Sequence, residues 1–125
     1  MKKLPKISES EWLVMRVLWS KSPLTANEVV EKLAGKTKWK PKTVKTLINR
    51  LLKKGAVKFQ KEGRKYRYYS AVSEAECVGT QSRSFIQRVY GGAARPMLAA
   101  FLEDAELSAE DIAELKKILE QKAEE

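Results

Sequence analysis

The stretch PKTVKTLINRLLKKG, residues 41–55, decides the fold of this 125-residue chain. Its apolar residues recur every three or four positions, at Val44, Leu47, Ile48, Leu51 and Leu52. This spacing predicts an amphipathic helix. Proline suits the first position of a helix and glycine the position just past its end, so we expect the helix to begin at Pro41 and to stop at Gly55.

The opposite face of this predicted helix is polar and basic. Its residues are Lys42, Thr43, Lys45, Thr46, Asn49, Arg50 and Lys53. The major groove of DNA admits one helix, and short polar and cationic side chains near the helix N-terminus suit its base edges and phosphates. Asn49 suits adenine, and Arg50 suits guanine or a phosphate. Trp39, just before the helix, is either a hydrophobic staple or a contact to the DNA backbone. A solvated cationic helix face is the alternative interpretation.

The apolar period changes from 3.6 to 2 after this helix. Residues 57–60 and 65–68 each alternate apolar or aromatic side chains with polar ones, around a turn that contains Gly63. The two segments predict a β-hairpin. Its tip carries Lys61, Arg64 and Lys65: Arg64 suits a minor groove or its flanking phosphates, while the lysines add charge without sequence information. A plain exposed hairpin is the alternative.

The rest of the chain is predicted to be helical. A Ser or Thr followed three residues later by an acid begins four of the expected helices: Ser8 with Glu11, Thr25 with Glu28, Ser73 with Glu76, and Ser108 with Asp111. The first two helices precede residue 41, so the order helix, helix, helix, hairpin predicts a winged helix-turn-helix domain over residues 1–72. Residues 73–125 are expected to form a helical domain, with helices near 74–90, 93–103 and 109–123. The fold class is therefore mainly α with a small β-hairpin.

The C-terminal helices carry apolar stripes that three short helices cannot easily bury against one another. A second copy of the chain would supply the missing surface, so we expect a homodimer. The residues expected to form the dimer interface are Phe85, Val89, Met97, Leu98, Phe101, Leu102, Ile112, Leu115 and Leu119.

The distribution of charge changes close to the boundary expected between the two domains. The net charge is +9, and residues 1–70 hold nineteen Lys and Arg against five Asp and Glu, whereas residues 71–125 hold six against eleven. A basic N-terminal module with a balance of +14 indicates a polyanionic partner. We therefore predict DNA-binding residues at Trp39, Lys42, Thr43, Thr46, Asn49, Arg50, Lys53, Arg64 and Lys65.

Composition argues against several other classes of function. The chain has no histidine and one cysteine, Cys77, so it lacks the usual general base and the usual zinc ligands. We expect no enzyme, no metal and no cofactor, and we interpret Cys77 as a packing residue rather than a redox sensor. No apolar run approaches the ~20 residues of a membrane helix. The basic N-terminus Met1–Pro5 has no apolar segment behind it, so we expect no signal peptide and a cytoplasmic protein.

Several stretches resemble the penicillinase repressor (BlaI/MecI) family. They are residues 37–47, 52–56, 61–64, 84–92, 101–103, 107–112 and Leu115. The resemblance implies a homodimeric winged-helix repressor on a palindromic operator, ahead of genes for β-lactam resistance or the cell-wall response. It implies that Lys42, Thr43 and Thr46 contact the operator. It also implies induction by a membrane sensor protease, with cleavage in the C-terminal domain at Ala100-Phe101.

Two positions depart from the family pattern. Relatives carry asparagine before the cleaved phenylalanine, where this chain has Ala100, and a serine suited to capping the helix, where this chain has Lys40. The copper-responsive relatives have C-terminal cysteine pairs that this sequence does not have. We therefore do not expect copper sensing.

Other functions remain open at the level of sequence. Winged helices also serve as protein-docking or RNA-binding modules without repressor activity. Tyr66, Tyr68 and Tyr69 could stack on the bases of a single strand, although alternation directs part of this set into the core.

Overall fold

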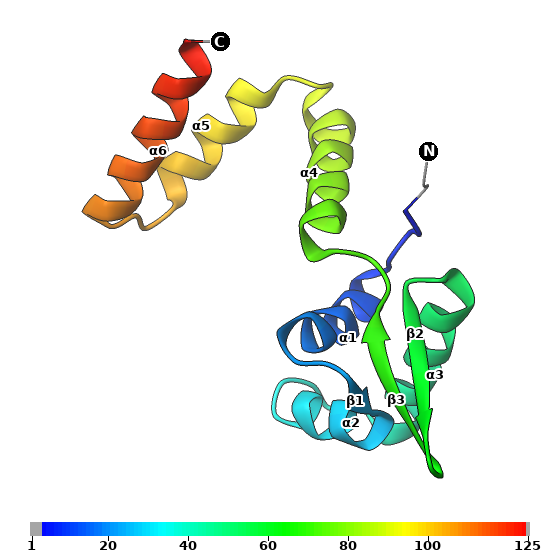
Figure 1. Cartoon of the computed structure of the whole chain (residues 1–125). Coiled ribbons are helices and arrows are strands. Elements are labelled where there is room, and N and C mark those ends of the chain that lie inside the picture. Colours follow the sequence, from blue (N-terminus) through cyan, green and yellow to red (C-terminus); the bar gives the residue numbers. More distant parts are fainter. Residues whose placement is uncertain (1–3, 125) are drawn as a thin grey trace. The chain divides into compact units, whose positions relative to one another are not determined.

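A computed structural model describes residues 4–124 of the chain (Figure 1). Met1, Lys2 and Lys3 of the expected basic N-terminus, and Glu125, lie outside the described residues. The elements in chain order are α1 (Glu9–Ser20), β1 (Leu24–Thr25), α2 (Ala26–Ala34), α3 (Pro41–Lys54), β2 (Val57–Glu62), β3 (Lys65–Ser70), α4 (Glu74–Tyr90), α5 (Ala94–Asp104) and α6 (Ala109–Ala123). The mainly α fold with a small β component is confirmed.

The helices begin where the capping signals predict. Ser8, Thr25 and Ser108 each accept a hydrogen bond from the backbone N–H three residues later, and the acid at that position accepts one from the cap residue in return. Such reciprocal bonds satisfy two donors that a helix otherwise leaves without a partner. At Ser73 the side chain accepts from the Glu76 amide at 3.0 Å. The expected helix starts are therefore confirmed from local bonds.

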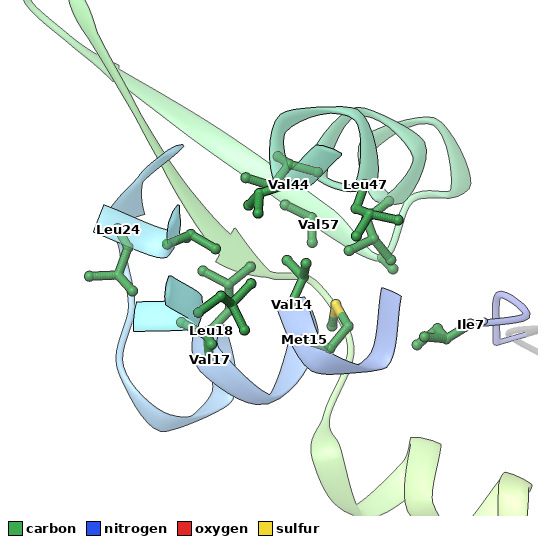
Figure 2. Packing of buried hydrophobic residues seen from close by; sticks show 14 of the residues in the cluster. Ile7, Val14, Met15, Val17, Leu18, Leu24, Val44, Leu47 and Val57 are labelled. Atoms are coloured by element: carbon green, nitrogen blue, oxygen red, sulfur yellow. The ribbon is translucent and has the colours of Figure 1, made fainter. Parts of the chain in front are cut away.

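The hydrophobic core lies between the first three helices and the sheet. In Figure 2, Val14 and Leu18 of α1, Val44 and Leu47 of α3, and Val57 of β2 point toward a common interior. All five side chains are buried. Because the buried residues of α3 occupy one face, the other face of this helix is left for solvent or a ligand.

The sheet has one more strand than the sequence predicts. The hairpin of β2 and β3 is present, and β1 pairs antiparallel with β3, which gives the order β1-β3-β2. At two residues, β1 is too short to show an alternating pattern. The hairpin turn is Gly63-Arg64, and Gly63 has φ +65°, as a type II′ turn requires at its first central residue.

The chain forms two compact units, Met1–Gln81 and Ser82–Glu125. The division falls within α4, nine residues beyond the boundary expected at 72/73. The reason is that Cys77, near the start of α4, is buried in the core of the first unit. Cys77 thus packs as expected, and burial first, then the Glu76 carboxylate, raises the pKa of its thiol.

Candidate nucleic-acid interface

The helix α3 has the two faces that its sequence predicts. Val44, Leu47, Ile48 and Leu51 are buried. The predicted polar face is exposed throughout, at Lys42, Thr43, Lys45, Thr46, Asn49, Arg50 and Lys53. The Thr46 hydroxyl donates to the Lys42 carbonyl at 2.9 Å, so its methyl group and its oxygen lone pairs stay available to a ligand. The geometry therefore presents one continuous row of short polar and cationic side chains.

The N-terminus of α3 has backbone amides with no side-chain cap. Pro41 occupies the first turn and the N-cap residue Lys40 makes no side-chain cap bond. Pro41 has no N–H and the Thr43 amide donates to the Lys40 carbonyl at 2.9 Å, so the Lys42 amide and the helix dipole are what favour an anion at this end. Trp39 is half-buried and packs against the core, as a staple would. This end of α3 is therefore suited to a phosphate group.

The C-terminus of α3 is held by a buried carboxylate. The Lys54 ammonium donates to Glu11 of α1 and, at 2.8 Å, to the Lys6 carbonyl. Glu11 is 1 % exposed and its second carboxylate oxygen has no hydrogen-bond partner among the described residues. Burial raises the pKa of Glu11, but hydrogen bonds from Lys54 and Ser8 outweigh it, so the pKa lies below its ordinary value. This ion pair fixes α3 against α1.

The tip of the β2–β3 hairpin, called the wing below, is exposed and basic. Arg64 and Lys65 are both exposed, and the Lys61 ammonium lies 5.9 Å from the centroid of the Tyr66 ring. Phe59 is 50 % exposed and packs edge-to-face on Tyr66 at 5.1 Å. The alternation therefore sends Val57 into the core, whereas Phe59 lies on the surface because the wing extends past the helices (Figure 1).

The predicted tyrosines lie in different environments. Tyr66 is 43 % exposed, whereas Tyr68 is half-buried and packs against the core. Tyr69, the third of the set, is half-buried as well. Only Tyr66 thus presents much of its ring to solvent, and a single ring is a small surface for stacking on the successive bases of a strand.

A groove of about 630 Å³ lies where the wing approaches the helices. Its walls come from β1, α2, α3, the hairpin turn and β3. The lining residues are Thr25, Ala26, Asn27, Glu28, Lys45, Arg64, Lys65, Tyr66, Arg67 and Tyr68. Four of these residues are cationic and one is acidic. Because Lys45 belongs to the exposed face of α3 and Arg64 to the wing, the groove brings the two predicted DNA-binding elements together.

Sequence reasoning missed Arg67, which lies in this groove. Its Nε donates to the Glu62 carboxylate at 2.7 Å, and its Nη1 lies 3.6 Å from Glu28 Oε1. The pKa of Glu28 is lowered, mainly by the hydrogen bonds from the Thr25 backbone and side chain and also by Arg67 and Lys21. Residues 28 and 67 are far apart in the chain, so no sequence spacing pointed to this contact.

The residues expected to form a dimer interface lie in the Ser82–Glu125 unit. Neither α5 nor α6 contains a buried residue. Phe101 is 54 % exposed although it stacks on Phe85, with centroids 6.2 Å apart. The other predicted positions are exposed at Val89, Leu98, Leu102, Ile112, Leu115 and Leu119, and half-buried at Met97. Ile118, outside the predicted set, is exposed as well.

Residues 4–124 contain neither a candidate metal site nor a helix that could span a membrane. This part of the chain holds no group of three or more His, Cys, Asp or Glu side chains placed to bind a metal ion. Its helices are also too short or too polar to cross a bilayer.

An exposed basic helix, a hydrophobic core behind it and a basic wing beside it define a winged-helix DNA-binding protein. The model of the penicillinase repressor family matches residues 7–121. The penicillinase repressor of Bacillus licheniformis is 43 % identical over 121 residues, which cover 97 % of this chain and 94 % of that protein. The methicillin resistance regulatory protein MecI of Staphylococcus aureus is 38 % identical over 117 residues, covering 94 % and 95 %. The chain belongs to the penicillinase repressor family, which is a family of transcriptional repressors and not of enzymes.

Solved structures agree with this fold. The solution structure of the DNA-binding domain of the repressor BlaI matches with a TM-score of 0.54 at 43 % identity, covering 61 % of this chain and 93 % of that one. The monomeric form of Bacillus licheniformis BlaI, solved in complex with the blaP half-operator, matches with a TM-score of 0.53 at the same identity and coverage. The winged-helix part of the fold is thereby confirmed.

Proposed function

We propose that this protein is a homodimeric transcriptional repressor that binds a palindromic duplex DNA operator. In each protomer α3 enters a major groove and the wing contacts the adjacent backbone or minor groove. The two half-sites lie about 34 Å apart, or a multiple of this, because the helices must meet the same face of the duplex. The observation that carries the proposal is the exposed polar and cationic face of α3 beside a basic wing.

The contacts divide into two chemical kinds. Thr43, Thr46 and Asn49 have no net charge and would read base edges, together with Arg50 where it meets guanine. The cations Lys42, Lys53, Arg64 and Lys65 would hold phosphates and would add affinity for any duplex. Trp39 stands just before α3, where its half-buried ring packs against the core and supports the helix, and it would contact the DNA backbone at this end. A relative has been solved with a half-operator, which supports this arrangement.

Dimerisation supplies the affinity that one helix and one wing lack. When two weakly binding units are joined in a dimer, the second unit binds intramolecularly, and the affinity for DNA rises by roughly 10²- to 10⁴-fold. The exposed apolar side chains of the Ser82–Glu125 unit support this part, because a monomer seldom exposes an apolar surface of this kind without a partner. The partner that fits it is the same surface of a second copy.

Family membership supports an inference about the regulated genes and the inducing step. The relatives are named for penicillinase and for methicillin resistance. We therefore infer control of β-lactam resistance or cell-wall-response genes in the cytoplasm. We also infer that a membrane sensor protease relieves repression by cutting at Ala100-Phe101. The cut separates most of the apolar dimer surface from the DNA-binding unit, so avidity is lost while α3 and the wing stay intact.

The test compares one base-reading residue with one phosphate-binding residue. Duplexes are first enriched from a random-sequence pool by the wild-type protein, and binding is then measured by fluorescence anisotropy at several salt concentrations. Thr46→Ala should weaken binding to the enriched duplex by about 1–3 kcal/mol and leave binding to random duplex almost unchanged. Arg64→Ala should weaken binding to the enriched and the random duplex by the same factor. It should also lower the number of counterions released on binding, measured from the salt dependence of the affinity, by about one.

Lys117→Ala, which removes an exposed cation from α6, is the control and should change neither affinity. Equal losses on both duplexes for Thr46→Ala would contradict base reading. Preference for single-stranded RNA over duplex DNA would instead favour an RNA-binding module. Failure to bind any nucleic acid would favour a protein-docking module.

A further inference from the structure

Arg67 joins the wing to the start of α2. It lies on the central strand β3, opposite Thr25 of β1, which is also the N-cap of α2. On one side its Nε donates to Glu62, at the tip end of β2; on the other its Nη1 faces Glu28 of α2. The Glu28 oxygen that faces Arg67 also accepts the Thr25 amide at 2.9 Å, so the cap holds this carboxylate in place.

The hydrophobic core holds the base of the hairpin, through Val57 and the half-buried Tyr68, but none of its residues lies in the wing at the tip. Val57 is the only buried residue of β2, and β3 contains no buried residue. Phe59 and Tyr66 pack on each other in the outer part of the wing, but both are exposed. Polar contacts between the wing and the helices therefore have a large share in setting its angle.

We propose that Arg67 is a positioning residue that ties the wing to α2 at the spacing at which α3 and the wing contact DNA together. This inference rests on the proposed function. Arg67 acts through its two carboxylate partners and not as a phosphate contact. A guanidinium presents several donors in a planar fork and can hold both acids, whereas an ammonium is a single compact charge.

If Arg67 ties the wing to α2, removing the charge of Glu62 should change DNA affinity in the direction opposite to the one that long-range electrostatics predicts. Glu62 is an acid in the wing, close to where a DNA backbone would pass. Removing its charge should strengthen DNA binding if nothing but long-range repulsion matters. If Glu62 holds Arg67, removing the charge should weaken binding, because the free wing then loses conformational entropy when it is ordered on the duplex. The sign alone therefore separates the two explanations.

The experiment measures binding of the full chain to the duplex that the wild-type protein enriches from a random pool. Glu62→Gln should weaken binding about two- to fivefold and Arg67→Gln about five- to tenfold, as expected for exposed ion pairs. Arg67→Lys keeps the charge and should still bind more weakly than wild type. The matched control is Glu31→Gln, which removes an exposed acid of α2 and should leave affinity unchanged or slightly higher.

Hydrogen exchange of the free protein provides a readout without DNA. Arg67→Gln should speed exchange of the β2 and β3 amides near Gly63, while the thermal midpoint changes little. Tighter or unchanged binding by Glu62→Gln, or wild-type affinity in Arg67→Lys, would overturn the tie. If the wild-type protein itself enriches no duplex, the proposed function fails, and the exchange measurement alone then decides whether Arg67 restrains the wing.

Discussion

Glu11 has two roles that depend on one carboxylate. It completes the capping box of α1, it accepts the Lys54 ammonium from the end of α3, and it does both while almost fully buried. A buried carboxylate is costly unless it is paired. Here the hydrogen bonds overcome the cost of burial, and the pKa of Glu11 lies below its ordinary value. The charged form is therefore the one that stabilises the fold.

The stabilisation should depend on pH. Because the pKa of Glu11 is lowered on folding, its contribution is full above the ordinary range of Glu and is lost as pH falls through the folded-state pKa. Glu11→Gln keeps the capping oxygen but removes the charge, and should lower the free energy of unfolding by about 1–3 kcal/mol near pH 7. The gap in thermal midpoint between wild type and variant should narrow as pH falls from about 5 to about 3.

Glu9→Gln, which changes an exposed acid in the same helical turn, is the control for general effects of charge. Glu9→Gln should lower the free energy of unfolding only slightly, and its gap in thermal midpoint from wild type should not narrow as the Glu11→Gln gap does. A gap for Glu11→Gln that stays constant over the whole pH range would contradict the role of the carboxylate charge.

At the scale of elements, α5 differs from α1, α2 and α6. Those three helices begin with capping boxes, whereas the N-cap of α5 is Ala93, which makes no side-chain cap bond. None of its residues is buried. A helix with neither a side-chain N-cap nor residues buried within its own protomer opens locally at low cost when the protomer is free. The proposed cleavage site Ala100-Phe101 lies inside this helix, so cutting requires such opening.

Capping α5 should therefore slow cleavage. Ala93→Asp supplies a side-chain acceptor at a position with extended backbone, and should stabilise the helix by about 0.5–2 kcal/mol. Intact-mass measurements during β-lactam treatment should then show slower loss of the full chain than in wild type. Ala123→Asp, at the end of α6, is the control and should be cut at the wild-type rate. A chain that stays intact during full induction would exclude cleavage as the trigger.

The whole molecule divides into a basic unit that suits DNA and a unit whose apolar residues lie on its surface. Their exposure is highest at Ile118 and Leu119 of α6, each 59 % exposed. Burying such side chains against a second copy is worth about 25 cal/mol per Å² of apolar area removed from water. A charge placed among them should disrupt association without disturbing the fold of one protomer, because they are exposed there.

Leu115→Glu should therefore produce monomers. Sedimentation equilibrium should give a dimer dissociation constant about 10²-fold higher than in wild type, or higher still. Affinity for a palindromic duplex should fall by roughly 10²- to 10⁴-fold, toward that of a half-site. Glu114→Gln, on the same helix, should leave both unchanged. A wild-type protein that is monomeric at working concentrations and still binds one specific site tightly would contradict the proposal.

The sequence by itself determined the helices, their ends and the two faces of α3. Apolar spacing, capping pairs and turn glycines act between residues a few positions apart, so Val44, Thr25 and Gly63 could each be interpreted without the fold. The class of protein and the family followed from the same local patterns.

Only the tertiary structure decided which distant residues meet. The Glu11–Lys54 contact joins residues 43 positions apart, the strand β1 exists only because β3 lies beside it, and Arg67 has its role because α2 and the wing approach each other. The packing of the core brings these groups together, and a polar contact over long separations has no periodic signature in the chain. The tertiary structure also decided which side chains are exposed. Phe59 fits an inward-facing pattern in the sequence, yet it lies on the surface because the wing extends past the core.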